Sequence, residues 1–277
     1  MTADSLYQGV KDGDSAVIIA AEYPVIGPWI SGESITDSII DFYGLPKGIT
    51  WTFDSLRAAH TFNTTFNRNG QVLYHPFLYD NGADYIEEGA RRFVDVKTGK
   101  MGLVHPYGRV LIPAKYDFLM PLKNGYTTAY RGVKRKSEAR GEHWSIVPDS
   151  TKQFRHTVVN RMGLEVKGHG EKDAENSVRL DDGNYYPTVY TIQDPEEQKM
   201  LDMLSTDQLV MKAAGPQPEK WQLKIIERPS PKFPYYVLGN IQSILPIYIA
   251  VDANARLYYF DYYRMIPLAD YLAAREY

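Results

Sequence analysis

Cysteine is absent from the 277-residue sequence. Its absence excludes disulfide bonds, thiolate chemistry and cysteine-ligated zinc. The sequence also lacks a run of about 18 apolar residues, so we expect no membrane-spanning helix. An excess of charge of one sign is missing as well, because 31 Lys and Arg stand against 34 Asp and Glu, for a net charge of −3. Nothing in this balance favours a polyanionic partner, and the sequence predicts no nucleic-acid role.

Sequence motifs of catalytic and metal sites are also scarce. The six histidines form no HExxH motif or other close pair, and neither GxSxG nor a phosphate-binding glycine loop occurs. Residues 168–175, "GHGEKDAE", contain the residue types of a metal site, but a segment of this composition is typical of a solvated loop. The sequence therefore predicts a non-enzymatic protein with no catalytic residues, no metal and no cofactor.

The first 14 residues, "MTADSLYQGVKDGD", are polar and contain no apolar segment of the kind found in signal peptides. Met1 fits a native start, and it fits equally well a methionine that replaces a removed signal peptide or lipoprotein leader. The compartment therefore stays open. We favour the periplasm or cell envelope, with the cytoplasm as the alternative.

Tyrosine is abundant, with 22 residues compared with 10 phenylalanines and 4 tryptophans. Tyrosine suits half-buried β surfaces and hydrated interfaces, because its ring is apolar and its hydroxyl group is polar. Over residues 63–192, short β-type runs alternate with turns that contain Gly, Asn-Gly or Pro. This spacing is typical of antiparallel hairpins rather than βαβ units. We therefore predict a β-rich, α+β fold of repeated antiparallel β-hairpins, with a β domain over residues 63–192.

Residues 1–62 are predicted to form an N-terminal α/β segment. Residues 16–21 have the apolar composition of a buried strand. Residues 31–48 are predicted to form a helix, because apolar residues follow one stripe and a Gly and a Pro come after them. The stripe consists of Ile35, Ile39, Ile40 and Tyr43. Residues 53–62 are predicted to form a second, short helix.

Residues 193–277 are predicted to form a C-terminal α+β domain that buttresses the β domain. A helix begins after Asp194, which has the side chain of an N-cap, and Pro195 occupies its first position. Four strands follow, and a last helix begins at Pro267. In "LYYFDYYRM", strand alternation places three aromatic residues on one face, which is either core under the last helix or a binding surface. These residues are Tyr258, Phe260 and Tyr262.

The middle of the chain contains an internal repeat. Gly70 begins "GQVLYHPFLYD" and Gly108 begins "GRVLIPAKYD", and both segments contain Val-Leu, a Pro and Tyr-Asp in that order. The second glycine follows the first by 38 residues, which lies within the range of repeat architectures. A more distant copy is predicted around residues 141–159. A single hairpin cannot bury its apolar face, so the copies are expected to stack.

The best-defined copy resembles the unit of the WG-repeat (KWG) proteins. Residues 99–104, "GKMGLV", match the naming motif with Met101 at the usual tryptophan position, and "GRVLIP" and "YD" complete the unit. The resemblance covers roughly residues 66–160, with Trp144 at the aromatic position of the next copy and Ser145 in place of its glycine. It implies stacked β-hairpins whose default role is protein–protein interaction.

A basic insert, "RGVKRKSEARGEH", lies at residues 131–143. It is either a solvated hairpin tip or an electrostatic contact for an acidic protein or anionic head groups. Tyr126 and Tyr130 lie in the strand that leads into it, and Tyr with Arg is a common composition of binding hot spots. The predicted protein-binding residues are Tyr126, Tyr130, Arg131, Lys134, Arg135, Lys136, Arg140 and Trp144.

The preferred hypothesis is a non-enzymatic bacterial protein that binds another protein. One specific form of it is an immunity protein that binds and neutralises a cognate toxin or effector. A carbohydrate- or cell-wall-binding module that uses exposed tyrosines and Trp144 is one alternative. A hydrolase with dispersed His and Asp residues is another, although no cluster of such residues stands out in the sequence.

Overall fold

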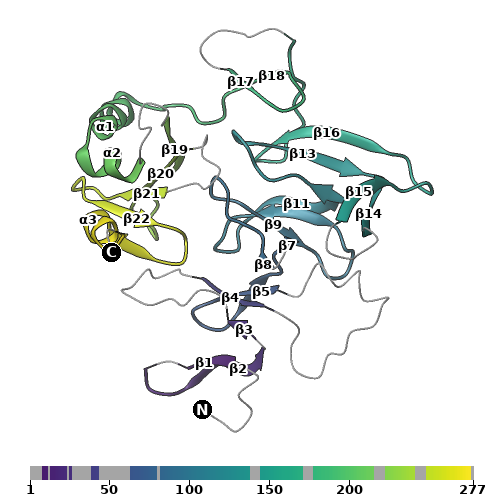
Figure 1. Cartoon of the computed structure of the whole chain (residues 1–277), viewed down its shortest axis with the longest axis horizontal. Helices are drawn as coiled ribbons and strands as arrows, with labels where there is room; N and C mark the ends of the chain where they lie inside the picture. The colour runs from purple at the N-terminus through teal and green to yellow at the C-terminus, as the bar shows by residue number, and fades with distance from the viewer. Residues whose placement is uncertain are drawn as a thin grey trace.

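The computed structural model describes residues 8–11, 13–23, 25–26, 39–43, 63–79, 82–137, 144–170, 177–214, 222–240 and 248–275. In this part of the chain, most regular structure is β-strand in small antiparallel sheets and hairpins, and a unit of helices and strands lies at the C-terminal end (Figure 1). This is the β-rich fold of repeated antiparallel hairpins with a C-terminal α+β unit that the sequence predicts. No helix among the described residues is long and apolar enough to cross a membrane.

Between residues 8 and 170, the described strands form four related units and one inserted hairpin. Unit 1 consists of β1 (Gln8–Lys11), β2 (Val17–Tyr23), β3 (Val25–Ile26) and β4 (Ile39–Tyr43). Unit 2 consists of β5 (Asn63–Asn67), β6 (Val72–Tyr74), β7 (Leu78–Tyr79), β8 (Gly82–Ala83) and β9 (Arg91–Val94). Unit 3 consists of β10 (Met101–Val104), β11 (Val110–Tyr116), β12 (Phe118–Leu119) and β13 (Tyr126–Arg131). The inserted hairpin of β14 (Val133–Ser137) and β15 (Trp144–Pro148) precedes unit 4, which consists of β16 (Arg155–Asn160) and the residues after it.

Each unit begins with a hairpin, which we call the opening hairpin. It has the same register in all four units. Each turn ends in a residue with positive φ, namely Ser15, Gly70, Gly108 and Gly163. The residue before each turn pairs with the residue six positions later, and these pairs are Lys11–Val17, Phe66–Val72, Val104–Val110 and Val159–Glu165. The repeat that we predicted at Gly70 and Gly108 is therefore a repeat of structure. It extends to residues 8–23, where we did not predict a copy.

Sheet pairing joins the units end to end. The last strand of each unit pairs with the first strand of the next, so that β4 pairs with β5, β9 with β10 and β13 with β16. Figure 1 shows the resulting stack running from the N-terminal strands to β13 and β16. One sheet of the stack, in the order β3-β4-β5-β6, contains strands from both sides of residue 62, where we predicted a domain boundary.

Turns of one unit also contact strands of the unit before it. A Cβ atom added to Gly70 of unit 2 would lie 2.2 Å from the carbonyl oxygen of Ile18 in unit 1. The positive φ of Gly70 and this close approach both exclude a side chain at the position. The equivalent glycines also lie against the preceding unit, but a Cβ atom there would meet side chains at longer distances, 3.2 Å from Leu73 at Gly108 and 3.6 Å from Ile112 at Gly163. The turn residue of the repeat is therefore a stacking contact as well as a turn.

The predicted helix over residues 31–48 is wrong where the structure describes it, because Ile39–Tyr43 form strand β4. This strand lies between β3 and β5 and is buried on both faces, with Ile39, Ile40 and Phe42 in the core. We interpreted the run of apolar residues as a helical stripe, but β-branched and aromatic residues buried on both faces fit a central strand. The rest of this range and the predicted helix over residues 53–62 lie outside the described residues.

Two details of the predicted repeat are also wrong. Trp144 lies in the inserted hairpin, and the register places His156 of β16 at the position that Met101 holds in unit 3. Tyr79 pairs with Gly82 in the short β7–β8 hairpin, so it does not correspond to the tyrosine that ends β11. Both errors arise because hairpins are inserted at different points in different units.

The C-terminal unit is a five-stranded antiparallel sheet with helices on one face (Figure 1). Its elements are α1 (Pro195–Ser205), α2 (Gln208–Ala214), β19 (Leu223–Glu227), β20 (Tyr236–Asn240), β21 (Tyr248–Val251), β22 (Leu257–Phe260), β23 (Met265–Pro267) and α3 (Leu268–Ala273). As predicted, Pro195 begins α1, and the Asp194 side chain accepts hydrogen bonds from two N–H groups of the first turn. Leu204 of α1, Leu238 of β20 and Leu272 of α3 belong to one core between the helices and the sheet.

The other face of this sheet packs against the stack. Phe260 and Tyr262 belong to a core that also includes Ile86 and Tyr107 of the stack. The aromatic face of "LYYFDYYRM" is therefore core, but it packs against the stack and not under the last helix as predicted. Tyr259 lies on the opposite face, where its ring stacks on that of Tyr271 in α3 at 3.7 Å between centroids.

Buried polar contacts reinforce this packing. Arg91 of β9 and Asp41 of β4 form a buried ion pair, with 2.8 Å between Arg91 Nη1 and Asp41 Oδ2. Tyr263 of the C-terminal unit donates a hydrogen bond to the same carboxylate at 2.5 Å. Tyr248 of β21 accepts a hydrogen bond from the backbone N–H of Glu88 at 2.6 Å. The C-terminal sheet is thus tied to units 1 and 2 as well as to the turn that precedes β9.

Candidate functional site

A strip of aromatic side chains, in which Tyr130 is half-buried and Phe154 and His156 are exposed, lies on one face of the β13–β16 pair. Tyr130 and His156 are opposite each other in the register, and Phe154 precedes β16. The centroids of the three rings lie 5.8 to 6.5 Å apart. Phe154 is 45% exposed, and Met120, which follows β12, is 41% exposed. We use the name β13–β16 face for the surface of Met120, Thr128, Tyr130, Phe154, His156 and Val158.

Strand alternation explains why β13 presents this surface. Thr127 and Ala129 are buried, whereas Thr128 and Tyr130 alternate with them and remain partly accessible. The N–H of Met120 donates a hydrogen bond to the carbonyl oxygen of Thr128 at 3.0 Å, which holds Met120 beside the strand. The buried side of β13 packs into the core of the stack, so the exposed side is presented by a fixed backbone.

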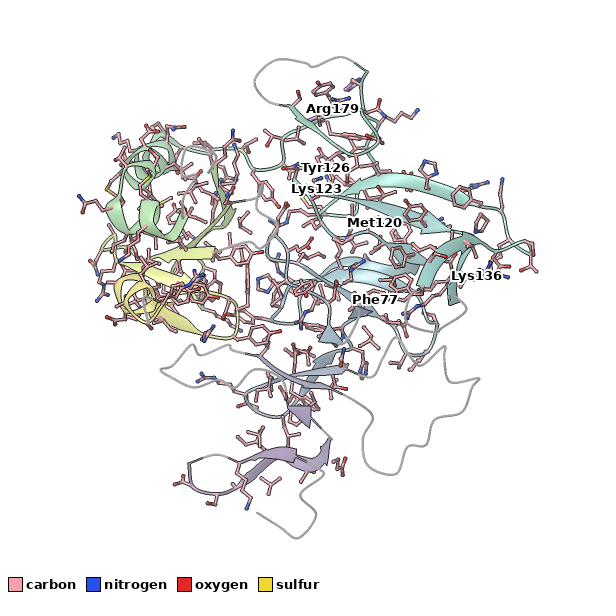
Figure 2. All side chains as sticks on the ribbon, viewed as in Figure 1. Phe77, Met120, Lys123, Tyr126, Lys136 and Arg179 are labelled. Carbon is pink, nitrogen blue, oxygen red and sulfur yellow. The ribbon has the colours of Figure 1, made fainter. Side chains whose placement is uncertain are left out.

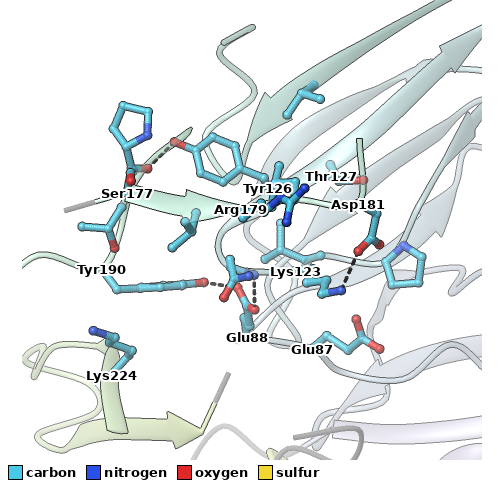
Figure 3. Close-up of a pocket in the computed structure, with 18 of the residues that line it drawn as sticks. Glu87, Glu88, Lys123, Tyr126, Thr127, Ser177, Arg179, Asp181, Tyr190 and Lys224 are labelled. Carbon is cyan, nitrogen blue, oxygen red and sulfur yellow. Dashed lines mark hydrogen bonds and ion pairs between the residues drawn. The ribbon is translucent and has the colours of Figure 1, made fainter. Parts of the chain in front are cut away.

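The β13–β16 face continues into a cleft of about 1630 Å³. Other walls of the cleft come from the hairpin of β17 (Ser177–Arg179) and β18 (Tyr185–Pro187) and from the first residues of β19. Figure 3 shows Lys224 of β19 on the side of the cleft opposite Tyr126 and Arg179. Lys123 and Asp181 form an exposed ion pair at 2.8 Å that links β17–β18 to the turn before β13. A cleft of this volume exceeds the range of about 300–1,000 Å³ that is usual for small-ligand sites.

Glu88 organises the floor of the cleft. Its carboxylate accepts hydrogen bonds from the backbone N–H groups of Asn124 and Gly125, both at 2.6 Å, and from the Tyr190 hydroxyl group at 2.5 Å. Burial raises the pKa of Glu88, and these hydrogen bonds oppose the shift. Glu88 and Asn124 both have positive φ and precede a glycine, so they occupy equivalent positions in the turns of units 2 and 3. The carboxylate therefore joins two equivalent turns of the stack.

Glu87, the neighbouring carboxylate, also lines the cleft. Burial is the main cause that raises the pKa of Glu87 to about 7, and the negative charges of Asp84 and Glu88 raise it further. The positive charge of Arg92 opposes this effect. Glu87 can therefore gain or lose a proton near neutral pH without losing any of the hydrogen bonds that hold the floor of the cleft.

The two tyrosines of the predicted site lie at different depths. Tyr126 is buried in the wall of the cleft, where its hydroxyl group donates a hydrogen bond to the Pro187 carbonyl oxygen at 2.6 Å. Its ring lies 5.3 Å from that of Tyr186. Tyr130 is half-buried and belongs to the aromatic strip. Tyr126 thus supports the cleft, and Tyr130 is the more accessible of the two tyrosines.

The predicted basic residues lie at the end of the molecule away from the C-terminal unit, and Figure 2 labels Lys136 there. Lys134, Arg135 and Lys136 occupy exposed positions on β14. The Arg135 guanidinium group lies 4.1 Å from the centre of the Trp144 ring, which is half-buried. Trp144 also packs against Phe77 of the stack. The remaining predicted residue, Arg140, lies outside the described residues.

Arg131 and Arg155 face each other across the β13–β16 pair. Directly opposed like charges are unfavourable in an antiparallel sheet. Arg131 lies over the ring of Tyr116 at 5.1 Å, and Arg155 donates a hydrogen bond to the Gln153 side chain at 2.7 Å. Neither arginine has a carboxylate partner within the described part of the chain. The end of the β13–β16 face therefore carries positive charge that the described residues do not neutralise.

A histidine and a carboxylate meet at one buried point away from the cleft. His105 Nε2 lies 3.0 Å from Glu227 Oε2, and the Tyr262 hydroxyl group donates a hydrogen bond to the same carboxylate. These groups are covered by the packing of the C-terminal sheet on the stack, which makes the contact a part of that interface. The described residues contain no cluster of three or more metal-ligating side chains, and residues 171–176 lie outside them.

Sequence reasoning did not single out Met120, Phe154 or His156. These residues lie beside Tyr130 only because β13 pairs with β16, and no local sequence pattern predicts that pairing. The signal that identifies β16 is the turn "NRMG", residues 160–163, which matches "NRNG" at residues 67–70. Comparison with known proteins finds no matching family model, no similar curated protein and no similar solved structure.

Proposed function

We propose that this protein is a non-enzymatic binding protein that docks another protein on the β13–β16 face. The observation that carries the proposal is the aromatic strip, in which half-buried Tyr130 packs against the core and Phe154 and His156 beside it are exposed. Aromatic residues, methionine and arginine are the residue types that are enriched in the cores of protein interfaces. Contiguous exposed apolar surface of this kind marks interaction sites on soluble proteins.

The charges around the face favour an acidic partner. Arg131 and Arg155 flank the strip, and Lys134 and Lys136 extend the positive surface along β14. Such a rim accelerates association with a negatively charged surface and selects against basic partners. The strip supplies the apolar contact, and the rim supplies the electrostatic selectivity.

Membership of the WG-repeat proteins is part of the same proposal. Gly102 holds the second glycine of "GKMG", and a Cβ atom there would lie 2.3 Å from the carbonyl oxygen of Ile112. Gly9 of unit 1 has the same environment, with 2.4 Å to the carbonyl oxygen of Ile19. A glycine is therefore required on steric grounds where the family motif has one, and this agreement supports the resemblance.

The specific partner that we propose is a toxin or effector, with this chain as its immunity protein. Among the alternatives, a carbohydrate-binding module that relies on Trp144 is less well supported, because Arg135 and Phe77 both lie against its ring. A hydrolase is less well supported because Glu87 and His156 both line the cleft, but among the described residues no histidine of the cleft forms a hydrogen bond with a carboxylate.

Affinity capture with matched variants tests the proposal. Wild-type protein, the Tyr130→Ala/Phe154→Ala double variant and a Tyr85→Ala control are immobilised, and proteins retained from the source cells are quantified by mass spectrometry. Tyr85 is an exposed aromatic residue that lies outside the β13–β16 face. The proposal predicts a protein that both wild type and the Tyr85→Ala control retain and that the double variant loses at least tenfold.

Identification of that protein as an enzyme toxic to the cell supports the immunity hypothesis. Equal retention of every captured protein by wild type and the double variant overturns the assignment of the face. Binding of a glycan by wild type, with loss in the double variant, replaces the protein partner with a carbohydrate.

A further inference from the structure

Within the described residues, the second strand of the opening hairpin is incomplete in unit 4. In units 1 and 3 this strand continues to a tyrosine opposite the start of the first strand, as the pairs Gln8–Tyr23 and Met101–Tyr116 show. The residue of unit 4 that corresponds to Met101 is His156. In the described residues, β16 pairs with β13 on one side and lies at the edge of its sheet.

The chain leaves this edge soon after the turn of unit 4. Val159 pairs with Glu165, and the N–H of Val166 donates a hydrogen bond to the Val158 carbonyl oxygen at 3.0 Å. His169 then pairs with Tyr185 of β18 instead. Within residues 144–170, no segment therefore occupies the position beside His156 that β11 occupies beside Met101 in unit 3.

Successive residues of a strand direct their backbone N–H and C=O groups to alternate sides. This alternation shows which backbone groups of β16 point away from β13. The carbonyl oxygens of Thr128 and Tyr130 accept hydrogen bonds from Met120 and Asp117, so both residues direct their backbone groups away from β16. The alternate residues of β13 bond to β16, and their partners there include Thr157 and Arg155. The backbone N–H and C=O of His156 consequently point outward, and they have no backbone partner among the described residues.

Units 3 and 4 have a positive charge at equivalent positions, but only in unit 3 do the described residues include its carboxylate partner. Lys100, directly before β10, forms an ion pair with Asp117 of the Tyr-Asp motif that ends β11. The residue of unit 4 equivalent to Lys100 is Arg155. Arg155 faces Arg131 and has no carboxylate partner in the described part of the chain. Among the described residues, no carboxylate therefore takes the place beside Arg155 that Asp117 takes beside Lys100 in unit 3.

We propose that the β16 edge at residues 155–157 accepts an extended segment of a partner protein as an added antiparallel strand, with an acidic side chain of that segment bound by Arg155. This inference rests on the proposed protein-binding function and specifies its mode. The added strand takes the place that β11 holds in unit 3, with an aromatic residue opposite His156 and an acidic residue next to it. Main-chain hydrogen bonds at an exposed edge supply affinity, and side-chain contacts supply selectivity.

A peptide copied from this chain provides the probe. Residues 110–118, "VLIPAKYDF", are the segment that fills the equivalent edge in unit 3. Binding of the capped peptide to the full chain is measured by fluorescence polarisation, together with a scrambled peptide and an Asp117→Asn peptide. We expect the native sequence to bind at least tenfold more tightly than the scrambled one, and we expect the Asn peptide to lose most of this advantage.

Two substitutions at His156 distinguish the contribution of its backbone N–H to peptide binding from that of its side chain. His156→Pro removes the outward N–H at a position where an edge strand tolerates proline, and it should weaken peptide binding by about tenfold. His156→Val keeps the N–H and should bind as wild type does. Arg155→Ala, which leaves the backbone intact, should abolish the preference for the Asp peptide over the Asn peptide and provides the test if His156→Pro does not fold.

Equal peptide affinity in wild type and His156→Pro overturns the proposal, as does a lack of binding by every peptide. Binding that appears only after residues 171–176 are replaced by Gly and Ser overturns it too, because the chain itself then covers the edge. A natural partner that is lost on Tyr130→Ala/Phe154→Ala but retained on His156→Pro overturns the added strand and leaves the proposed function intact.

Discussion

Two adjacent carboxylates show how position in the stack sets the behaviour of single residues. Glu88 is saturated with hydrogen bonds from the neighbouring turn and from Tyr190. Glu87 has the same side chain but lies beside Asp84 and Glu88, with Arg92 as the compensating charge. Burial and these negative neighbours raise the pKa of Glu87 to about 7. The first carboxylate is structural, and the second titrates in the cleft near neutral pH.

The raised pKa of Glu87 predicts how stability depends on pH. A carboxyl group whose folded-state pKa exceeds its unfolded value of about 4.5 binds protons preferentially in the folded state, so its contribution grows as pH falls through about 7. From pH 8 to pH 5.5, wild type should gain about 1 kcal/mol relative to Glu87→Gln, after discounting for partial exposure of the group. Urea unfolding of both proteins at the two pH values measures this difference.

The Gln variant serves as the control, because all other titrating groups are shared and cancel in the comparison. A stability difference between the two proteins that does not change with pH contradicts the assignment. A wild type that loses stability relative to the variant as pH falls contradicts it as well.

At the scale of elements, the turn glycines carry the contacts that stack the units. Gly70 and Gly99 provide a matched pair, since both have positive φ, at 74° and 66°. A Cβ atom at Gly70 would lie 2.2 Å from the Ile18 carbonyl oxygen, whereas one at Gly99 would meet nothing within 4 Å. The two positions therefore share the cost of the backbone conformation and differ in the stacking contact.

Alanine substitutions at Gly99 and Gly70 separate the cost of the backbone conformation from the cost of losing the stacking contact. Gly99→Ala should reduce the free energy of unfolding by roughly 1–2 kcal/mol, the cost of a left-handed conformation for a residue with a Cβ atom. Gly70→Ala should cost about 1–3 kcal/mol more, because the turn must move away from unit 1. Chemical unfolding of both variants measures the difference. Equal losses would show that unit 2 does not stack on unit 1 through this turn.

The hairpins were predictable because turn glycines and β-branched strand residues are local signals. "GRVLIP" after Gly108 specifies a strand by its own composition, and Asp194 with Pro195 specifies a helix start. The strand Ile39–Tyr43 was not predictable, because its helical spacing is overridden by pairing with β3 and β5. The β13–β16 face was only partly predictable, because Tyr130 and His156 meet across the β14–β15 insertion through a long-range pairing.

At the scale of the whole molecule, packing and hydrogen bonds join the C-terminal sheet to the stack. Its inner face packs against turns of the stack, and its tyrosines reach backbone and carboxylate groups there. The Tyr248 hydroxyl group bonds both the N–H of Glu88 and the carbonyl oxygen of Ile86, at 2.6 and 3.1 Å. We expect these contacts to make the stack and the C-terminal unit unfold together.

Tyr248→Phe tests this coupling. The substitution leaves the buried N–H of Glu88 unpaired and should cost about 1–2 kcal/mol. If the molecule opens as one unit, hydrogen exchange should accelerate by similar factors in β10 of the stack and β21 of the C-terminal unit. The control is Tyr259→Phe on the helix side of the sheet, which should change stability by less than about 0.5 kcal/mol. Acceleration confined to β21 would show two independently unfolding bodies.

We infer that unit 4 presents an open edge beside the β13–β16 face, an edge that units 1 and 3 close with their own second strand. Amide hydrogen exchange at two equivalent positions tests it most directly. The N–H of Met101 lies between β10 and β11, opposite Tyr116, and that of His156 faces the open side of β16. In the free protein, we predict that the Met101 amide is strongly protected and that the His156 amide exchanges at close to the rate of an exposed strand. Equal protection of the two amides would contradict the claim.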